Sequence, residues 1–267
     1  MAILMTKLMT PLLSARLLIC LVACMCSWQV SSEPLPKELR LVTGEDFKPW
    51  TDRSLKNGGV ITEIVQTVFK EINIETQVSW LPWKRGYQRV VSGSNDTFGT
   101  FPYSYSNTRA PDVYYSIPLM ISGLTIFVAK DSPVPKNYED QSALQGLRFC
   151  TGLGYAIDDF SALLEAGKIT LLRLANVENC FLNIKAGRAD AVVLNKHVGW
   201  GMIQSLYKGD HGFRALKEHK PSVYHLVVNK TYPNTLDILH EFNKGLVRLQ
   251  KSGVIDAIIN RHMQSAK

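Results

Sequence analysis

Short β-branched runs alternate with amphipathic helical segments from residue 39 to residue 262, and this alternation constrains the fold more than any other feature. Apolar side chains recur at helical spacing from Ile61 to Ile72, whereas Glu63 and Lys70 fall on the opposite face. We therefore expect a helix at residues 61–72 with one face packed on a sheet. Strands that alternate with helices in this way are typical of an α/β fold with a parallel sheet.

The same two periodicities predict the other elements. Strands are expected at residues 40–43, 77–81, 97–101, 147–151, 169–174 and 189–194. Helices are expected at residues 84–92, 138–144, 158–166, 177–186, 200–207, 239–249 and 254–262. Two further apolar runs, rich in β-branched residues, lie at residues 124–129 and 224–228.

A weak internal repeat suggests that the chain folds as two α/β lobes. A helix ends at Gly93 and Asp96 opens the next strand, and the same spacing recurs at Gly187 and Asp190. The two apolar runs named above are then candidates for the segments that cross between the lobes.

Two crossings would insert one lobe into the other along the chain. The first lobe would comprise residues 33–123 and 229–267, and the second would comprise residues 124–228 with both crossing runs. Two linkers allow the lobes to hinge and to enclose a ligand in the cleft between them.

Residues 1–32 are expected to be an export signal that does not belong to the fold. Basic residues flank short apolar runs, and residues 17–23 are uncharged but too short to span a bilayer. Two processing sites compete: residues 21–24 resemble a bacterial lipobox, which would lipidate Cys24, and residues 30–32 offer an ordinary small-residue cleavage site. The protein is therefore expected in the periplasm, either free or lipid-anchored through Cys24.

The charge pattern argues against a nucleic-acid partner. The chain has 30 basic and 23 acidic residues, and they are scattered rather than gathered in the patch that counterion-release binding requires. After the signal, no segment approaches the roughly 18 uninterrupted apolar residues of a membrane helix. We expect a monomer with a substantial hydrophobic core.

Only two cysteines follow the signal, Cys150 and Cys180. An oxidising compartment makes such a pair a candidate disulfide. Two unpaired, buried thiols are the alternative, and the residues alone do not decide between them.

Several segments carry a resemblance to a known family. They are residues 42–50 (VTGEDFKPW) with Gly58 and Gly59, residues 81–85 (LPWKR), residues 99–103 (GTFPY), residues 108–118 (TRAPDVYYSIP) and residues 187–191 (GRADA). Together they resemble family 3 of the bacterial extracellular solute-binding proteins, the polar amino acid receptors of ABC importers. The resemblance runs from about residue 39 to residue 262. It implies a type II periplasmic-binding fold, in which two lobes close on a small-molecule ligand without altering it.

The resemblance also implies ligand contacts. Arg109 falls where the family's arginine grips a ligand carboxylate, and its planar guanidinium suits a bidentate pair. A surface role, or a pair with Asp112, is the alternative. Aromatic residues would line the site from the first lobe, although any of them could belong to the core instead, Trp50 above all: Phe47, Trp50, Trp83, Phe101 and Tyr103. Tyr155, after Gly154, replaces a threonine that usually contacts the ligand from the second lobe.

Two further positions bear on the ligand. Family members that bind α-amino acids commonly place an acidic residue where this chain has Asn195, and an amide can accept from an ammonium group but supplies no charge. An ordinary amino acid is therefore a less secure ligand than the fold implies. The resemblance also favours a disulfide between Cys150 and Cys180, because related proteins often carry cysteines at both places.

Two other functions remain open. The sequence lacks the Gly-x-Ser-x-Gly, phosphate-loop, Cys-x-x-Cys and His-Glu-x-x-His motifs, so we expect no enzyme, no metal and no cofactor. A periplasmic dehydratase of the same fold would need a general acid or base near the cleft, for which Glu45 and Asp46 are the nearby candidates. A receptor of this kind can also serve a membrane sensor instead of an ABC permease.

Overall fold

In the part of the chain that the computed structural model describes, residues 34–207, 211–218 and 220–264, ten strands form one mixed sheet. The strands are β1 (Glu38–Thr43), β2 (Glu75–Trp80), β3 (Thr97–Ser104), β4 (Val113–Tyr115), β5 (Met120–Ala129), β6 (Arg148–Gly152), β7 (Thr170–Leu174), β8 (Ala191–Asn195), β9 (Phe213–Ala215) and β10 (Lys220–Asn229). Their order is β2-β1-β3-β10-β5-β8-β6-β7, with β4 paired to β10 and β9 paired to β5.

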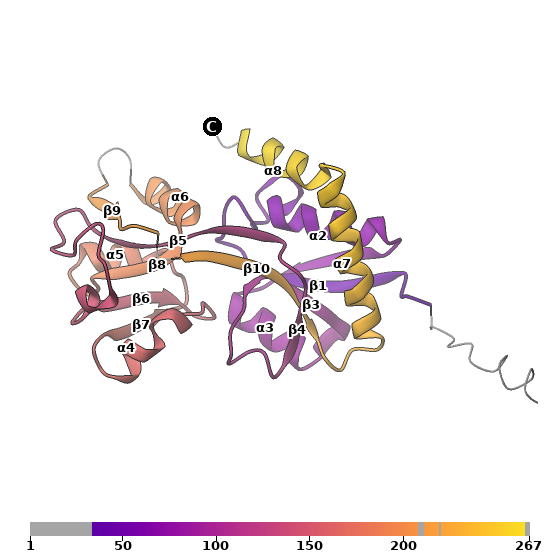
Figure 1. Cartoon of the computed structure of the whole chain (residues 1–267), viewed down its shortest axis with the longest axis horizontal. Helices are drawn as coiled ribbons and strands as arrows, with labels where there is room; N and C mark the ends of the chain where they lie inside the picture. The colour runs from indigo at the N-terminus through magenta and orange to yellow at the C-terminus, as the bar shows by residue number, and fades with distance from the viewer. Residues whose placement is uncertain (1–33, 208–210, 219, 265–267) are drawn as a thin grey trace, which may run out of the picture. The chain divides into compact units, whose positions relative to one another are not determined.

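The two longest strands, β5 and β10, pair antiparallel in the middle of this order. Strands β1 to β4 lie on one side of the pair and β6 to β9 on the other, as Figure 1 shows. We call these the β1–β4 group and the β6–β9 group, each with the helices that cover it. Both long strands continue from one group into the other, since β10 pairs with β3 and β5 pairs with β8.

Seven α-helices cover the sheet in the described residues. They are α2 (Val60–Glu71), α3 (Trp83–Val91), α4 (Ser161–Glu165), α5 (Asn179–Lys185), α6 (Lys196–Leu206), α7 (Thr235–Lys251) and α8 (Val254–Gln264). Four single turns of 3-10 helix add to them: η1 (Lys56–Gly58), η2 (Ser94–Asp96), η3 (Gln141–Leu144) and η4 (Asp158–Phe160). Figure 1 shows α2, α3, α7 and α8 with the β1–β4 group, and α4, α5 and α6 with the β6–β9 group.

Burial follows each strand's place in the sheet. Every residue of β8 is buried and nearly every residue of β3, whereas the edge strand β2 alternates between exposed and half-buried side chains. A strand covered on both faces needs apolar residues at successive positions, while an edge strand does not. The sheet is therefore deepest around β3 and β8, the strands whose ends reach the functional site.

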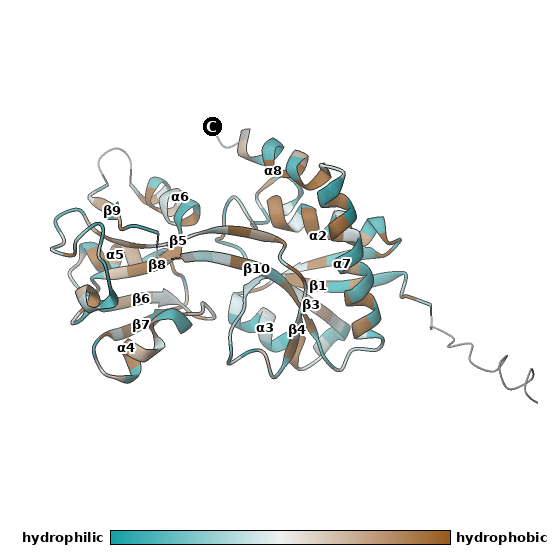
Figure 2. Cartoon of the chain, in the orientation of Figure 1, coloured by the Kyte–Doolittle hydropathy of each residue, from teal (hydrophilic) through white to brown (hydrophobic). Residues whose placement is uncertain are grey.

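The helix expected at residues 61–72 is present as α2. Its apolar face is fully buried at Ile61, Ile64 and Val68 and packs against α7 and α8. Figure 2 shows hydrophobic and hydrophilic residues side by side on α7, as an amphipathic helix requires. Burial of such stripes against the sheet is the main source of stability for helices of this length.

Two expectations about the elements were wrong, and two short strands were missed. The sheet is mixed rather than parallel, because β5 and β10 run antiparallel to their neighbours. The helix expected at residues 138–144 is only the turn η3, since the Asp140 carboxylate accepts from the Ser142 amide and starts the turn there. The strands β4 and β9 were not expected, because three residues are too few to show a period.

The boundaries between the predicted lobes stay a prediction, because residues Leu35–Lys267 form one compact unit. The predicted export signal and Cys24 lie outside the described residues. No helix in the described part of the chain is both long and apolar enough to cross a bilayer.

Candidate functional site

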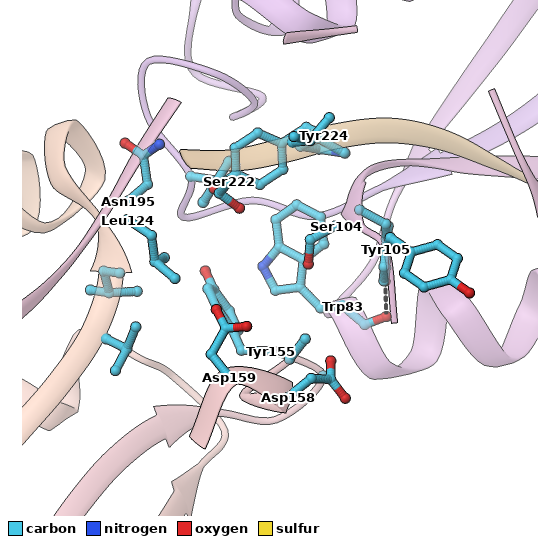
Figure 3. A pocket seen from close by; sticks show the side chains of 18 of the residues that line it. Trp83, Ser104, Tyr105, Leu124, Tyr155, Asp158, Asp159, Asn195, Ser222 and Tyr224 are labelled. Atoms are coloured by element: carbon cyan, nitrogen blue, oxygen red, sulfur yellow. Dashed lines mark hydrogen bonds between the residues drawn. The ribbon is translucent and has the colours of Figure 1, made fainter. Parts of the chain in front are cut away.

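A cavity of about 270 Å³ lies where β3, β5, β8 and β10 meet the loops of both groups. Ligand pockets typically enclose about 300–1,000 Å³, so this cavity lies at the small end of the range and suits a solute of amino-acid size. Figure 3 shows Trp83, Tyr155 and Asp159 directed toward its middle, while the ring of Tyr105 turns away. Among the residues that the structure describes, the charged side chains that line the cavity are Arg109, Asp158 and Asp159.

The structure brings six of the eight predicted contact residues to this cavity: Phe47, Trp83, Tyr103, Arg109, Tyr155 and Asn195. Trp50 and Phe101 do not line it. Trp50 is buried behind it and its indole Nε1 donates to the Asn195 Oδ1 at 3.2 Å. Phe101 is fully buried in the core cluster around β3. Whether any of the eight contacts a ligand stays a prediction.

Three rings from the β1–β4 group form one wall of the cavity, and we call Phe47, Trp83 and Tyr103 the aromatic wall. The Trp83 ring meets the rings of Phe47 and Tyr103 edge to face, with centroids 5.9 Å apart in both pairs. The Tyr103 hydroxyl donates to the Trp83 carbonyl at 2.8 Å. Each ring thus restrains the next, which gives the cavity a preformed apolar surface.

The opposite wall is the loop of residues 153–159, which follows β6 and which we call the cleft loop. Gly154 has a left-handed φ of 93°, and a Cβ there would lie 2.8 Å from the Lys84 backbone nitrogen. Only glycine therefore allows this close approach between the loop and the start of α3. The next side chain, Tyr155, packs edge to face on the Trp83 ring, with centroids 6.2 Å apart.

Arg109 connects the two walls. Its guanidinium lies over the Tyr103 ring, 4.9 Å from the centroid, and its Nη2 donates to the Gly154 carbonyl at 2.7 Å. A guanidinium offers five donors, and its other donors have no hydrogen-bond partner among the described residues. The group is therefore positioned by the protein and still able to bind an anion. The predicted alternative partner, Asp112, accepts instead from the Tyr87 hydroxyl at 3.3 Å.

Asp46 lies behind the junction of the two walls. Its Oδ1 accepts from the Trp83 indole at 3.0 Å and from the Tyr155 hydroxyl at 3.4 Å. Burial raises the pKa of Asp46 to about 6, although these two hydrogen bonds act in the opposite direction. Burial also raises the pKa of Tyr155 well above its ordinary value, so its hydroxyl stays neutral and donates.

Asn195 ends β8 and caps α6. Its Oδ1 accepts from the amides of His197 at 3.0 Å and Val198 at 3.4 Å, in addition to the Trp50 indole. Its Nδ2 donates to the Ser122 hydroxyl at 2.6 Å. The amide thus serves as an N-cap and joins Trp50 of the β1–β4 group to β8, which explains its burial without a ligand.

The structure contains the predicted disulfide between Cys150 and Cys180. Cys150 lies in β6 and Cys180 in α5, and both are buried. Since the cleft loop starts immediately after β6, the disulfide anchors the base of the loop that carries Tyr155.

Sequence reasoning missed several residues of the cavity. Asp158 and Asp159 stand at the start of the helix expected at residues 158–166, where acidic side chains favour the helix dipole, yet neither caps η4 through its side chain and both line the cavity. Ser222 and Tyr224 both lie in β10; Tyr224 begins the run expected at residues 224–228 and Ser222 precedes it, and neither gave a sign of facing a site. In the described residues, no three His, Cys, Asp or Glu side chains gather as metal ligands.

Comparison with protein families gives one match. The model of the bacterial extracellular solute-binding proteins, family 3, covers residues 39–265. No curated protein is significantly similar to the chain in sequence.

Solved structures share the fold. The chain is similar to an ancestral arginine-binding protein bound to arginine, with a TM-score of 0.72, 20% identity, and 85% and 99% of the two chains covered. It is also similar to an amino acid ABC transporter substrate-binding protein from Streptococcus pneumoniae bound to L-arginine. That match has a TM-score of 0.68 and 18% identity, and it covers 85% of this chain and 95% of the other. A histidine kinase sensor domain with similarity to periplasmic binding proteins matches with a TM-score of 0.70 and 20% identity, over 84% of this chain and 95% of the sensor domain.

Proposed function

The chain belongs to family 3 of the bacterial extracellular solute-binding proteins, and we propose that it captures one small, polar, carboxylate-bearing solute in the cavity beside Arg109. Its fold is the type II periplasmic-binding fold that the sequence resemblance implied. The solute would be bound without chemical change, as in a receptor that delivers its ligand to a membrane partner.

The state of Arg109 is the observation that carries this proposal. The Tyr103 ring and the Gly154 carbonyl hold the guanidinium at the edge of the cavity, and donors remain for a carboxylate. Guanidinium and carboxylate form two parallel, charge-assisted hydrogen bonds, which are stronger than neutral ones. A fixed cation in a small cavity thus favours a solute with a carboxylate over a neutral one of the same shape.

The two walls supply the rest of the binding surface. The rings of Phe47, Trp83 and Tyr155 can pack against the apolar part of a solute or attract a cationic group through their faces. Because the rings are already packed on one another, little conformational entropy is lost when a solute enters.

Contacts between the two groups support closure around a solute. Besides the Arg109 and Asp46 bonds, the Ser106 hydroxyl donates to the Asp158 carboxylate at 3.3 Å, and Trp50 donates to Asn195. All of them lie beside the cavity, so opening it would break them together. We propose that the lobes, residues 33–123 with 229–267 and residues 124–228, open and close about β5 and β10.

The partner would be an inner-membrane ABC permease or a membrane sensor. Solved structures of this fold include both an ABC transporter component and a histidine kinase sensor domain. Export through residues 1–32, with or without lipidation of Cys24, would place the protein in the periplasm beside either partner. Identification of a permease gene or a kinase gene next to this one would distinguish the two.

The test begins with thermal-shift screening of the purified protein against amino acids, dicarboxylates and polyamines, because a ligand that binds only the folded state raises the melting temperature. Calorimetric titration of the best carboxylate should then show one site. Arg109→Ala should weaken binding by about 2 kcal/mol, or roughly 30-fold, since the solute's buried carboxylate loses its charged partner. Arg109→Lys should recover part of this loss, because lysine keeps the charge but not the fork.

Arg85→Ala is the matched control, because Arg85 is exposed on α3 and does not line the cavity. It should bind as the wild type does. If Arg109→Ala retained affinity within about threefold of wild type for the best carboxylate, the proposed anchor would be wrong. Turnover of a bound solute would instead favour the enzyme alternative.

A further inference from the structure

A second pocket, of about 440 Å³, adjoins the cavity at the cleft loop, and we call it the outer pocket. The two hollows share five lining residues, which are Arg109, Gly154, Tyr155, Ala156 and Asp158. Residues of α3, α4 and the end of β7 complete the outer pocket, whereas no described residue of β5, β8 or β10 lines it. It is therefore a separate space at the junction of the two groups, and the proposed binding of a carboxylate in the cavity does not use it.

Among the described residues, three cationic side chains and one carboxylate line the outer pocket. Lys84 comes from α3 and Arg109 from the loop after β3, both in the β1–β4 group, while Arg173 comes from β7 in the β6–β9 group. The carboxylate is that of Asp158, which is exposed and accepts from the Ser106 hydroxyl at 3.3 Å. The pocket thus has an excess of positive charge, and both groups contribute to it.

Two of these cations keep donors for an anion. The Nη1 of Arg173 donates to the Tyr155 carbonyl at 3.1 Å, which holds the guanidinium against the cleft loop, and its other nitrogens have no hydrogen-bond partner among the described residues. The exposed Lys84 ammonium makes no hydrogen bond or ion pair with a described residue. Its position follows from the close approach at Gly154, where a Cβ would lie 2.8 Å from the Lys84 backbone nitrogen.

This arrangement suits an oxyanion such as phosphate or sulfate. A guanidinium binds two oxygens of such an ion through parallel N–H donors, and an ammonium binds a further oxygen as a compact charge. Like charges that face one space repel each other, so an anion between Lys84 and Arg173 would remove a repulsion and also gain charge-assisted hydrogen bonds.

We propose that the outer pocket is an oxyanion site, in which Lys84 and Arg173 bind inorganic phosphate or the phosphate group of a small monoester. Because the two side chains belong to different groups, the bound anion bridges the β1–β4 group and the β6–β9 group. A consequence for the solute rests on the proposed function: if the lobes close as proposed, the anion favours the closed form and raises the affinity for the solute in the cavity.

Calorimetric titration of the purified protein with sodium phosphate, in a chloride buffer of constant ionic strength, tests the site without any solute. The wild type should show one saturable phosphate site, and glycerol 3-phosphate in a parallel titration distinguishes a monoester from the free ion. Lys84→Gln and Arg173→Gln should each weaken phosphate binding by roughly fivefold or more, because each removes a charged partner that solvent screens only in part. Arg173→Lys should lose less, since it keeps the charge.

Arg85→Gln is the matched control for the two glutamine variants. Arg85 follows Lys84 on α3, is exposed and lines neither hollow. It should bind phosphate as the wild type does, and weakening equal to that of Lys84→Gln would mean a general attraction to basic residues rather than a site. A melting curve in chloride checks that each variant is folded, and the wild-type titration does not depend on any variant.

The remaining outcomes separate the outer pocket from the cavity. A wild type that does not distinguish phosphate from chloride has no oxyanion site, whichever solute it binds. Displacement of phosphate by the best carboxylate from the screen would place the phosphate beside Arg109 in the cavity and contradict the proposal. Simultaneous binding, with solute affinity raised roughly threefold by phosphate in the wild type but not in Lys84→Gln, supports it. If no carboxylate binds at all, the proposed function fails, and the phosphate titration still decides the role of the outer pocket.

Discussion

The aromatic wall and the cleft loop enclose the same cavity by different means. Phe47, Trp83 and Tyr103 belong to the β1–β4 group and contact one another edge to face, so the neighbouring rings fix their positions. The cleft loop belongs to the β6–β9 group and depends on a left-handed glycine, a tyrosine and two aspartates. One wall is apolar and built from packed rings, and the other is polar and built on a loop.

This difference suggests a division of roles. The aromatic wall sets the size of the cavity, because packed rings cannot change position without disturbing their neighbours. The cleft loop carries the carboxylates, and Arg109 spans the gap between the walls. We therefore expect changes in the cleft loop to alter which solute binds, and changes in the aromatic wall to alter how tightly any solute binds.

Removal of the disulfide should have the largest effect on stability. Cys150 and Cys180 are 30 residues apart, and closing a loop of that length stabilises a fold by roughly 3–4 kcal/mol in the chain-entropy model. The double variant Cys150→Ala/Cys180→Ala should lose about that much unfolding free energy in urea titrations. Because the cleft loop is anchored at this disulfide, the variant should also bind the best solute more weakly.

The aromatic wall contacts the cleft loop, because the ring of Tyr155 packs on Trp83. Tryptophan fluorescence of the folded variant should therefore change if the cleft loop loosens. A variant with wild-type stability and affinity would show that the disulfide does not support the cleft loop.

Asp46 accepts hydrogen bonds from both walls, and its titration should have a smaller, pH-dependent effect on the stability of the fold. The pKa of its carboxyl is about 6 in the folded protein against 3.8 in the unfolded chain. Because the folded-state pKa is raised, the stabilising contribution is complete below pH 4 and is lost as the pH rises through 6. Relative to Asp46→Asn, the wild type should therefore lose roughly 2 kcal/mol of unfolding free energy between pH 4 and pH 7.

Chemical unfolding of both proteins at several pH values measures this difference directly. Asp131→Asn, at an exposed position outside the cavity, should follow the wild type at every pH. A difference between wild type and Asp46→Asn that does not vary with pH would mean that burial does not raise the pKa of Asp46.

The aromatic wall could be predicted from the sequence and the cleft loop only in part. Phe47, Trp83 and Tyr103 lie in motifs that resemble a known family, and the structure places all three at the cavity. Asp159 has a simpler local explanation as a charge at a helix start, and its place in the cavity depends on contacts between distant segments. The raised pKa of Asp46 likewise depends on burial, which no local pattern reveals.

The fold shows the same limit. The long periodic segment at residues 61–72 predicted α2 (Val60–Glu71) within one residue at each end. The antiparallel course of β5 and β10 could not be predicted, because a β-branched run does not specify its neighbour or its direction. Strand pairing is decided by contacts far apart in the sequence, and it is these pairings that bring the two walls together.

A crystal structure of the protein with the tightest solute from the screen tests the central claim most directly. The account predicts a solute between the aromatic wall and the cleft loop, with its carboxylate paired to the Arg109 guanidinium. Density for the solute outside this cavity, or a carboxylate that does not contact Arg109, would contradict it.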